Sequence, residues 1–206
     1  MNSENQNNIN KNNLGNTKDL VGYPRNPGQP EQNSIWNADV QVVENIFTQK
    51  ETNKIMASAL TARKVTFKEI FSQRQHKLDL DEDLSKKVIA ITENLSGTKN
   101  LELLGCSYAV YQNVKKENGP AHRPTLTEHF DVNMGGPRIT LDVQVASNID
   151  WAIVVDGQSY ILKDNQAILF SGTNQKHKRE LKLFRDDQYM HMLFLHFGVK
   201  QEGETV

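Results

Sequence analysis

The chain has 206 residues, a formal net charge of −1 and one cysteine, Cys106. This length suits a single hydrophobic core, and the near-neutral charge argues against nucleic acid or an anionic membrane as a partner. One cysteine excludes an intramolecular disulfide, and no apolar run is long enough to cross a bilayer or to resemble a secretory signal. We therefore expect a cytoplasmic protein.

The first 34 residues differ in composition from the rest of the chain. They contain ten asparagines, with Gly, Pro, Gln and Ser between them and almost no aromatic residues. Such a segment cannot bury enough apolar surface to offset the entropy of ordering. Residues 1–34 are predicted to be a disordered tail, with a short docking segment at residues 20–24 as the alternative. Residues 35–206 are predicted to form one domain.

The first part of this domain is predicted to be helical support, over about residues 49–97. Residues 39–47 suit either a strand or the entry to a helix, and the apolar spacing at 49–62 predicts a helix. A second helix begins after Asp81, a good N-cap, and ends before Gly97. Its apolar stripe should face the core and consists of Leu84, Val88, Ile91 and Leu95.

From about residue 100 to 200, short runs of branched and aromatic residues predict strands. The predicted strands are residues 101–114, 125–131, 138–146, 151–155, 158–162, 166–171, 176–184 and 189–198. Asp156-Gly157 predicts a hairpin turn. Eight strands preceded by helices indicate a mostly β fold with N-terminal helices, built on an antiparallel, cupin-like jelly roll.

His129 and Asp131 form a His-x-Asp triplet, and a spacing of two places both side chains on one face of an extended segment. His177 follows a buried strand that ends at Gly172, and in a jelly roll the chain returns to the same mouth over this distance. The three residues then form a two-histidine, one-carboxylate facial triad, which suits Fe(II) and leaves coordination positions open.

The segment 122–198 resembles the catalytic core of the 2-oxoglutarate/Fe(II)-dependent oxygenases, particularly the prolyl-hydroxylase-like branch. The similarity lies in His129-Phe130-Asp131, the strand and turn at 164–172, the cluster His177 to Glu180 and the closing strand at 192–197.

This resemblance implies a double-stranded β-helix, with His129, Asp131 and His177 as catalytic metal ligands. It also implies Fe(II) as cofactor, with 2-oxoglutarate and O2 as co-substrates. The expected reaction is hydroxylation of a protein side chain, an amino acid or a small metabolite, with release of succinate and CO2. Asp131 favours hydroxylation over halogenation, since related halogenases lack this carboxylate.

One part of the family pattern is missing. Members usually carry an Arg or Lys after the distal histidine to bind the far carboxylate of 2-oxoglutarate, but residues 189–197 contain neither. Arg179, two positions beyond His177 and hence on the same face, is the first candidate for this role. The further candidates, in order, are Arg185 and His191, and Tyr108 or Tyr111 could donate a hydroxyl to the same carboxylate.

Two other functions fit the same pattern. A cupin-type metalloenzyme that does not use 2-oxoglutarate has the same fold, although the chain lacks a His-x-His pair followed by Glu. A non-catalytic jelly-roll binding module is the second alternative, because fold alone does not define function. The expected partner is a small-molecule or peptide substrate; the sequence predicts neither its identity nor the oligomeric state.

Overall fold

The computed structural model describes residues 39–62, 64–68, 73–116, 119–122, 124–131 and 138–200. The predicted tail, residues 1–34, lies outside them. The helices are α1 (Gln49–Leu60) and α2 (Glu82–Ser96). The strands are β1 (Gln41–Val43), β2 (Val65–Lys68), β3 (Gln73–Lys77), β4 (Leu101–Gln112), β5 (Val114–Lys116), β6 (Gly119–His122), β7 (Leu126–His129), β8 (Ile139–Ser147), β9 (Ile153–Val155), β10 (Gln158–Tyr160), β11 (Ala167–Phe170), β12 (His177–Arg179) and β13 (Tyr189–Val199).

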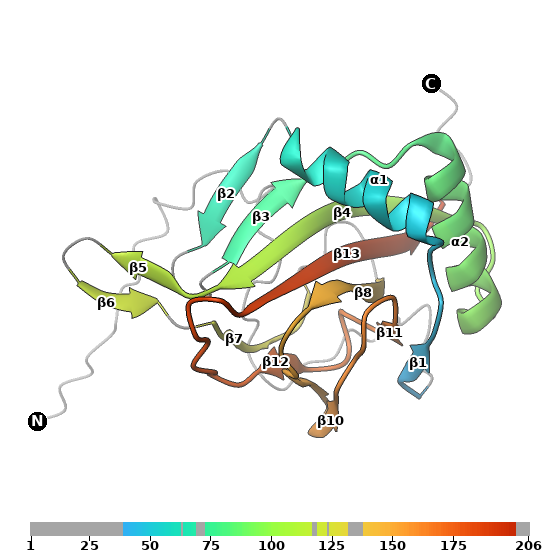
Figure 1. The fold of residues 1–206 in the computed structure, drawn as a ribbon. Coiled ribbons are helices and arrows are strands. Elements are labelled where there is room, and N and C mark those ends of the chain that lie inside the picture. The colour runs from blue at the N-terminus through green and yellow to red at the C-terminus, as the bar shows by residue number, and fades with distance from the viewer. Residues whose placement is uncertain are drawn as a thin grey trace, which may run out of the picture.

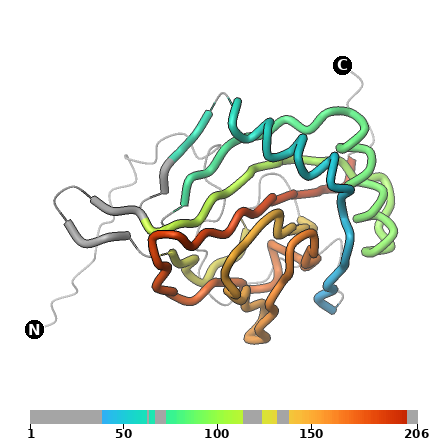
Figure 2. The backbone as a smooth tube through the Cα atoms, in the orientation of Figure 1, coloured from blue at the N-terminus to red at the C-terminus, as the bar shows by residue number. Residues whose placement is uncertain are grey.

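The strands form two main sheets, and every pairing is antiparallel. The large sheet has the order β1-β11-β8-β13-β4-β3-β2, and the small sheet has the order β10-β9-β12-β7. The two helices lie against one face of the large sheet, and the small sheet lies beneath the other face (Figure 1). The closing strand β13, red in Figure 2, runs between β4 and β8. The prediction of a mostly β, antiparallel fold with helices before the main strands is confirmed.

Both faces of the large sheet are buried, so β13 contributes to two cores. Leu193, Leu195 and Phe197 pack with the helices, together with Ile55 of α1 and Val88 of α2. The alternate residues Met190, Met192 and Phe194 face the small sheet and pack with residues such as Trp151 and Ile153. Because side chains alternate along a strand, one strand separates a helix-side core from the interior between the sheets.

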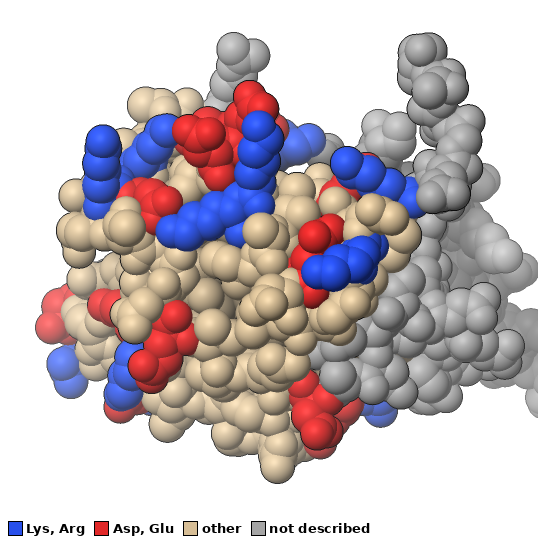
Figure 3. All heavy atoms as spheres, turned by 90° about the vertical axis from the view of Figure 1, so that its right-hand side faces the viewer, with Lys and Arg blue, Asp and Glu red and all other residues tan. Residues whose placement is uncertain are grey.

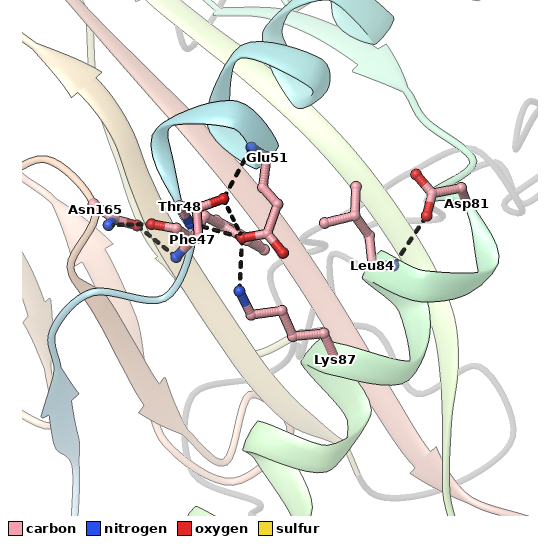
Figure 4. A network of polar contacts seen from close by, with 7 residues as sticks. All are labelled: Phe47, Thr48, Glu51, Asp81, Leu84, Lys87 and Asn165. Carbon is pink, nitrogen blue, oxygen red and sulfur yellow. Dashed lines mark hydrogen bonds and ion pairs between the residues drawn. The ribbon is translucent and has the colours of Figure 1, made fainter.

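The helix starts are fixed by polar side chains (Figure 4). Thr48 and Glu51 form a capping box at α1, and Glu51 also binds Lys87 of α2 at 2.7 Å. Asp81 caps α2 as predicted, and Gly97 ends that helix in the left-handed conformation (φ 69°). Asn165, shortly before β11, forms two hydrogen bonds with the backbone of Phe47: its Oδ1 accepts from the N–H, and its Nδ2 donates to the carbonyl. These bonds hold the segment before α1 against the large sheet.

The sequence prediction differs from the structure in three places. The hairpin of β5 and β6 was not predicted, since the predicted strands on either side were 101–114 and 125–131. The region predicted as helical support contains the hairpin β2–β3, which extends the large sheet through pairing of β3 with β4. The strand predicted at 176–184 is shorter in the structure and ends at Arg179. Its pairing with β7 is already irregular, since the register shifts between His177 and Arg179. The Asp-Gly hairpin is confirmed: Asp156 (φ 47°) and Gly157 (φ 81°) join β9 to β10.

On the face shown in Figure 3, the described residues form no large patch of one charge sign. Lysine, arginine, aspartate and glutamate side chains lie beside one another there. Ion pairs on the surface include Lys54 with Asp81 and Lys86 with Glu82. Neither described helix has the length and apolar character that a transmembrane span requires.

Candidate metal centre

His129, Asp131 and His177 meet in the interior between the two sheets. His129 ends β7, and His177 begins β12 directly opposite it in the antiparallel register, with ring centroids 4.2 Å apart. Asp131 follows β7 by two residues. One potential ligand atom from each residue lies within 4.8 Å of the others, and all three side chains are buried. The structure therefore brings together the three residues that the sequence selected.

The two imidazole rings are oriented by backbone carbonyl groups. His129 Nδ1 lies 2.7 Å from the carbonyl oxygen of Thr127, and His177 Nδ1 lies 3.1 Å from that of Gln175. A carbonyl only accepts, so Nδ1 carries the proton in each ring. Nε2 is then the ring nitrogen left for a metal, an arrangement that commonly supports metal-binding histidines. Burial lowers the pKa of His177, but Asp131 outweighs this effect and raises it, so a metal would replace a proton on that ring.

Asp131 is held from several sides. The hydroxyl of Thr140 donates to Asp131 Oδ2 at 2.5 Å, and His196 Nδ1 lies 3.5 Å from the same oxygen. Burial raises the pKa of this carboxyl, but His196 and His177 outweigh that effect and hold it well below its usual range. Asp131 therefore remains an anion, which is the form that binds a cation.

Gly172 makes the close approach to this carboxylate possible. Its carbonyl accepts from the backbone N–H of Asp131 at 2.7 Å. A Cβ at Gly172 would lie 1.9 Å from Asp131 Oδ2 and 2.2 Å from Thr140 Oγ1. Only glycine fits at this position, so the turn that ends β11 is part of the site.

A small, open pocket lies beside the triad, with a cavity volume of about 30 Å³. Besides the triad, the lining residues are Gln73, Gln75, Tyr111, Leu126, Thr140, Asp142, Phe194 and His196. The polar groups among them come from β3, β4, β8 and β13 of the large sheet. The arrangement thus places polar side chains of the large sheet beside a possible metal site.

Arg179 is fully buried near this pocket, although it does not line it. Its guanidinium donates to the carbonyl of Trp151, lies 5.1 Å from the centre of the Trp151 ring and contacts Met192 Sδ at 3.7 Å. Burial lowers its pKa, which the nearby Tyr111 and Asp142 partly offset. No described carboxylate forms an ion pair with Arg179. A buried cation without a counter-ion is costly, which favours an anionic ligand at this end of the interior.

The other candidates for the carboxylate-binding role lie in three different places. Tyr111 lines the pocket, and its hydroxyl accepts from Gln73 Nε2 at 2.8 Å. Tyr108 and His191 bond each other at 2.8 Å, but Tyr108 belongs to the helix-side core on the opposite face of the large sheet. Arg185 is exposed and pairs with Asp187. The structure brings Tyr111 alone among these four to the triad.

Sequence reasoning missed several residues that line the pocket. Thr140 and Asp142 alternate along β8 with the apolar residues of the helix-side core, and both are buried. A polar stripe on a strand in the middle of the sequence normally indicates a solvent-exposed face. Here it indicates a polar interior. Gln73 and Gln75 of β3 were missed because that strand was not predicted.

Many solved structures share this fold, and three illustrate the similarity. An oxidoreductase of the 2OG-Fe(II) oxygenase family from Burkholderia pseudomallei is 10% identical, with a TM-score of 0.58 over 77% of this chain and 84% of its own. A prolyl-4-hydroxylase from Pseudomonas putida is 11% identical, with a TM-score of 0.57 over 79% and 93% of the two chains. HygX from Streptomyces hygroscopicus, with nickel and 2-oxoglutarate bound, is 9% identical, with a TM-score of 0.54 over 78% and 82%.

No protein-family model matches the chain, and no curated protein matches it. At about 10% identity the structural similarities establish the fold alone: the chain has the fold of the 2-oxoglutarate/Fe(II) oxygenases, prolyl-4-hydroxylases among them. The function has to be argued from the site.

Proposed function

We propose that the protein is a 2-oxoglutarate- and Fe(II)-dependent dioxygenase with a double-stranded β-helix core, which hydroxylates a small molecule or a peptide. The observation that carries this proposal is the buried cluster of His129, Asp131 and His177 beside a polar pocket. Two histidines and one carboxylate leave coordination positions free, which is typical of non-haem Fe(II) oxygenases and unlike a structural zinc site with four protein ligands.

The donor set fits this metal. His129 and His177 would each offer Nε2, because each Nδ1 is bonded to a carbonyl, and Asp131 would offer a carboxylate oxygen. Thr140 and the backbone at Gly172 hold that carboxylate in place. When bound, Fe(II) with 2-oxoglutarate and dioxygen supplies the oxidising power for hydroxylation, and succinate and CO2 are released.

Arg179 is our candidate for binding the far carboxylate of 2-oxoglutarate. It lies in the interior two residues beyond His177, is fully buried and has no carboxylate partner in the described part of the chain. Tyr111 and Asp142, which both line the pocket, interact electrostatically with Arg179, so its positive charge is close to the side of the pocket that they form. Arg185, exposed and paired with Asp187, lacks these properties.

The test is binding and turnover of 2-oxoglutarate with matched variants. Protein loaded with Fe(II) should release succinate, and His177→Ala should abolish both metal binding and succinate release while its circular dichroism stays unchanged. Arg179→Ala should raise the KM for 2-oxoglutarate at least tenfold without changing metal affinity, because a buried charge pair loses one partner. Arg185→Ala is the control and should behave as the wild type.

Two results would contradict the proposal. Metal binding without any response to 2-oxoglutarate would favour a cupin-type metalloenzyme on the same fold. A His177→Ala protein that binds Fe(II) as the wild type does would remove the metal site itself and would favour a binding module.

A further inference from the structure

A second cavity lies away from the triad, at the end of β8. Its volume is about 490 Å³, and its walls are formed by Gln144, by residues 147–150 and by residues 163–164. None of these residues lines the pocket beside the triad. Gln144 is four residues beyond Thr140, about 13 Å along the strand. Cavities that hold small organic molecules have volumes of about 300–1,000 Å³, so this one is large enough for such a ligand.

Hydrogen bonds of the fold hold the walls of this cavity in place. The backbone N–H of Gln144 donates to the carbonyl of Gln166 at 2.9 Å, and the carbonyl of Gln144 accepts from Asn165 at 2.7 Å. On the other wall, the side-chain oxygen of Asn148 accepts from the backbone N–H of Tyr189 at 2.8 Å. The cavity is therefore formed by the chain itself before any ligand binds, as is usual for small-molecule sites.

Gln144 brings an unpartnered acceptor to this cavity. The residue is 3% exposed, and its side-chain oxygen Oε1 has no hydrogen-bond partner. Its Nε2 donates to Asp164 Oδ1 at 3.1 Å, which fixes the orientation of the amide, because the reversed amide would place two oxygen atoms against each other. A buried acceptor without a donor is destabilising, so a ligand that donates to Oε1 would offset this effect.

The charged groups of the cavity define what kind of ligand it favours. Two of its lining residues are acidic, Asp150 and Asp164, and one is basic, Lys163. Lys163 pairs with Asp150 at 2.9 Å, whereas Asp164 forms no ion pair in the described part of the chain. Gln144 Oε1 and the Asp164 carboxylate are thus neighbouring acceptors with one negative charge between them. A matching ligand group carries a positive charge and several N–H donors.

We propose that this cavity is a second binding site of the protein, and that it binds a small organic molecule through a primary ammonium group. The ammonium donates to Gln144 Oε1 and to the carboxylate of Asp164, and the organic part of the ligand occupies the remaining volume. A bare Ca²⁺ ion matches less well, because it takes about six to eight oxygen ligands. The inference goes beyond the proposed function and does not depend on the metal centre.

The experiment is an NMR titration of the full chain, followed through the side-chain amide signal of Gln144. This signal is identified by its loss in Gln144→Met. The probe is butylammonium chloride. 1-Butanol has the same carbon chain without the charge, tetramethylammonium has the charge without an N–H donor, and CaCl2 supplies a divalent cation. We expect butylammonium alone to shift the signal saturably, with a Kd of about 1–10 mM, which is usual for a ligand of so few atoms.

Two variants and a control test the residues that carry the proposal. Asp164→Asn keeps an acceptor for the Gln144 amide but removes the charge, so it should weaken butylammonium binding about tenfold or more. Gln144→Met removes the acceptor and should weaken binding about fivefold or more, measured by the backbone signals of residues 147–150. Glu82→Gln changes an exposed carboxylate of α2 and should bind as the wild type does. Melting temperatures close to that of the wild type exclude a folding defect.

Each of the contrary outcomes would overturn the inference. Equal shifts with 1-butanol or with tetramethylammonium would show that the cavity does not recognise an ammonium group. Tighter binding of Ca²⁺ than of butylammonium would make it a metal site. If butylammonium gave no saturable shift, or if both variants bound it as the wild type does, Gln144 and Asp164 would be satisfied by water alone.

Discussion

Replacing Gly172 by alanine should damage the metal site without touching any proposed ligand. The added Cβ would lie 1.9 Å from Asp131 Oδ2, whereas real contacts of this kind are not shorter than 3.0 Å. The carboxylate or the turn must therefore move by about 1 Å, twice the tolerance of about 0.5 Å within which a functional site has to be held. Thr140, whose hydroxyl would be 2.2 Å from the same Cβ, blocks the easiest movement.

Two effects of Gly172→Ala should be measurable. Overpacking should destabilise the metal-free protein by about 1–3 kcal/mol, which lowers the melting temperature by roughly 2–4 °C for each kcal/mol. Displacement of Asp131 should weaken metal binding by about 10- to 100-fold, as the loss of a supporting contact typically does. Thermal unfolding with and without saturating Ni(II) reports both effects, because the metal stabilises only the protein that binds it.

Gly105→Ala is the matched control. A Cβ at Gly105 meets only His196 Cδ2, at an ordinary distance of 3.8 Å, so the melting temperature and the metal-dependent shift should stay close to those of the wild type. If Gly172→Ala also melted and bound metal as the wild type does, the close contact with Asp131 would not constrain the site, and this reasoning would be refuted.

Three further predictions concern stability and the support of the site. Thr140→Val should lower metal affinity about 10-fold in a competition titration with a chelator, since the proposed carboxylate ligand loses its donor; unchanged affinity would show that this hydroxyl does not orient it. Hydrogen bonds from Lys87 and then from Thr48 lower the pKa of Glu51 to about 2, so the stability that Glu51 contributes is complete above its ordinary pKa of 4.5 and is lost as the pH falls toward 2. Lys87→Met should therefore flatten the dependence of unfolding free energy on pH in that window, and an unaltered acid limb would contradict the assignment. Deletion of residues 1–33 should leave the melting temperature nearly unchanged, and a large loss of stability would show that the tail packs against the domain.

Local patterns in the sequence were sufficient for much of the fold. The stripe from Leu84 onward, the N-cap Asp81 and the stop at Gly97 define α2 because helix signals are local. The hairpin at Asp156-Gly157 was predictable for the same reason. The hairpin β2–β3 was not, since Gln73, Gln75 and their polar neighbours form a strand only through pairing with β4.

The triad could also be predicted from the sequence. The His-x-Asp spacing places His129 and Asp131 on one face of a strand, and the distance to His177 is that over which a jelly-roll chain returns to the same opening. It did not decide which face of each strand is the interior. Tyr108 and Tyr111 are three residues apart and therefore lie on opposite faces of β4, one among the helices and one in the pocket. When both faces of a strand are buried, hydrophobic alternation does not distinguish them.

The tertiary structure alone decided the surroundings of the triad. The neighbours of Asp131 come from β8, β13 and the turn after β11, and those from β13 and the turn are far from it in sequence; the need for glycine at 172 arises from this close packing. Asp142 of β8 and Arg179 of β12 are electrostatic neighbours because the two sheets pack against each other, not because their strands pair. The residue types that can bind a metal are visible in the sequence. The packing of the two sheets determines which of them share one interior, because that depends on contacts that no local pattern encodes.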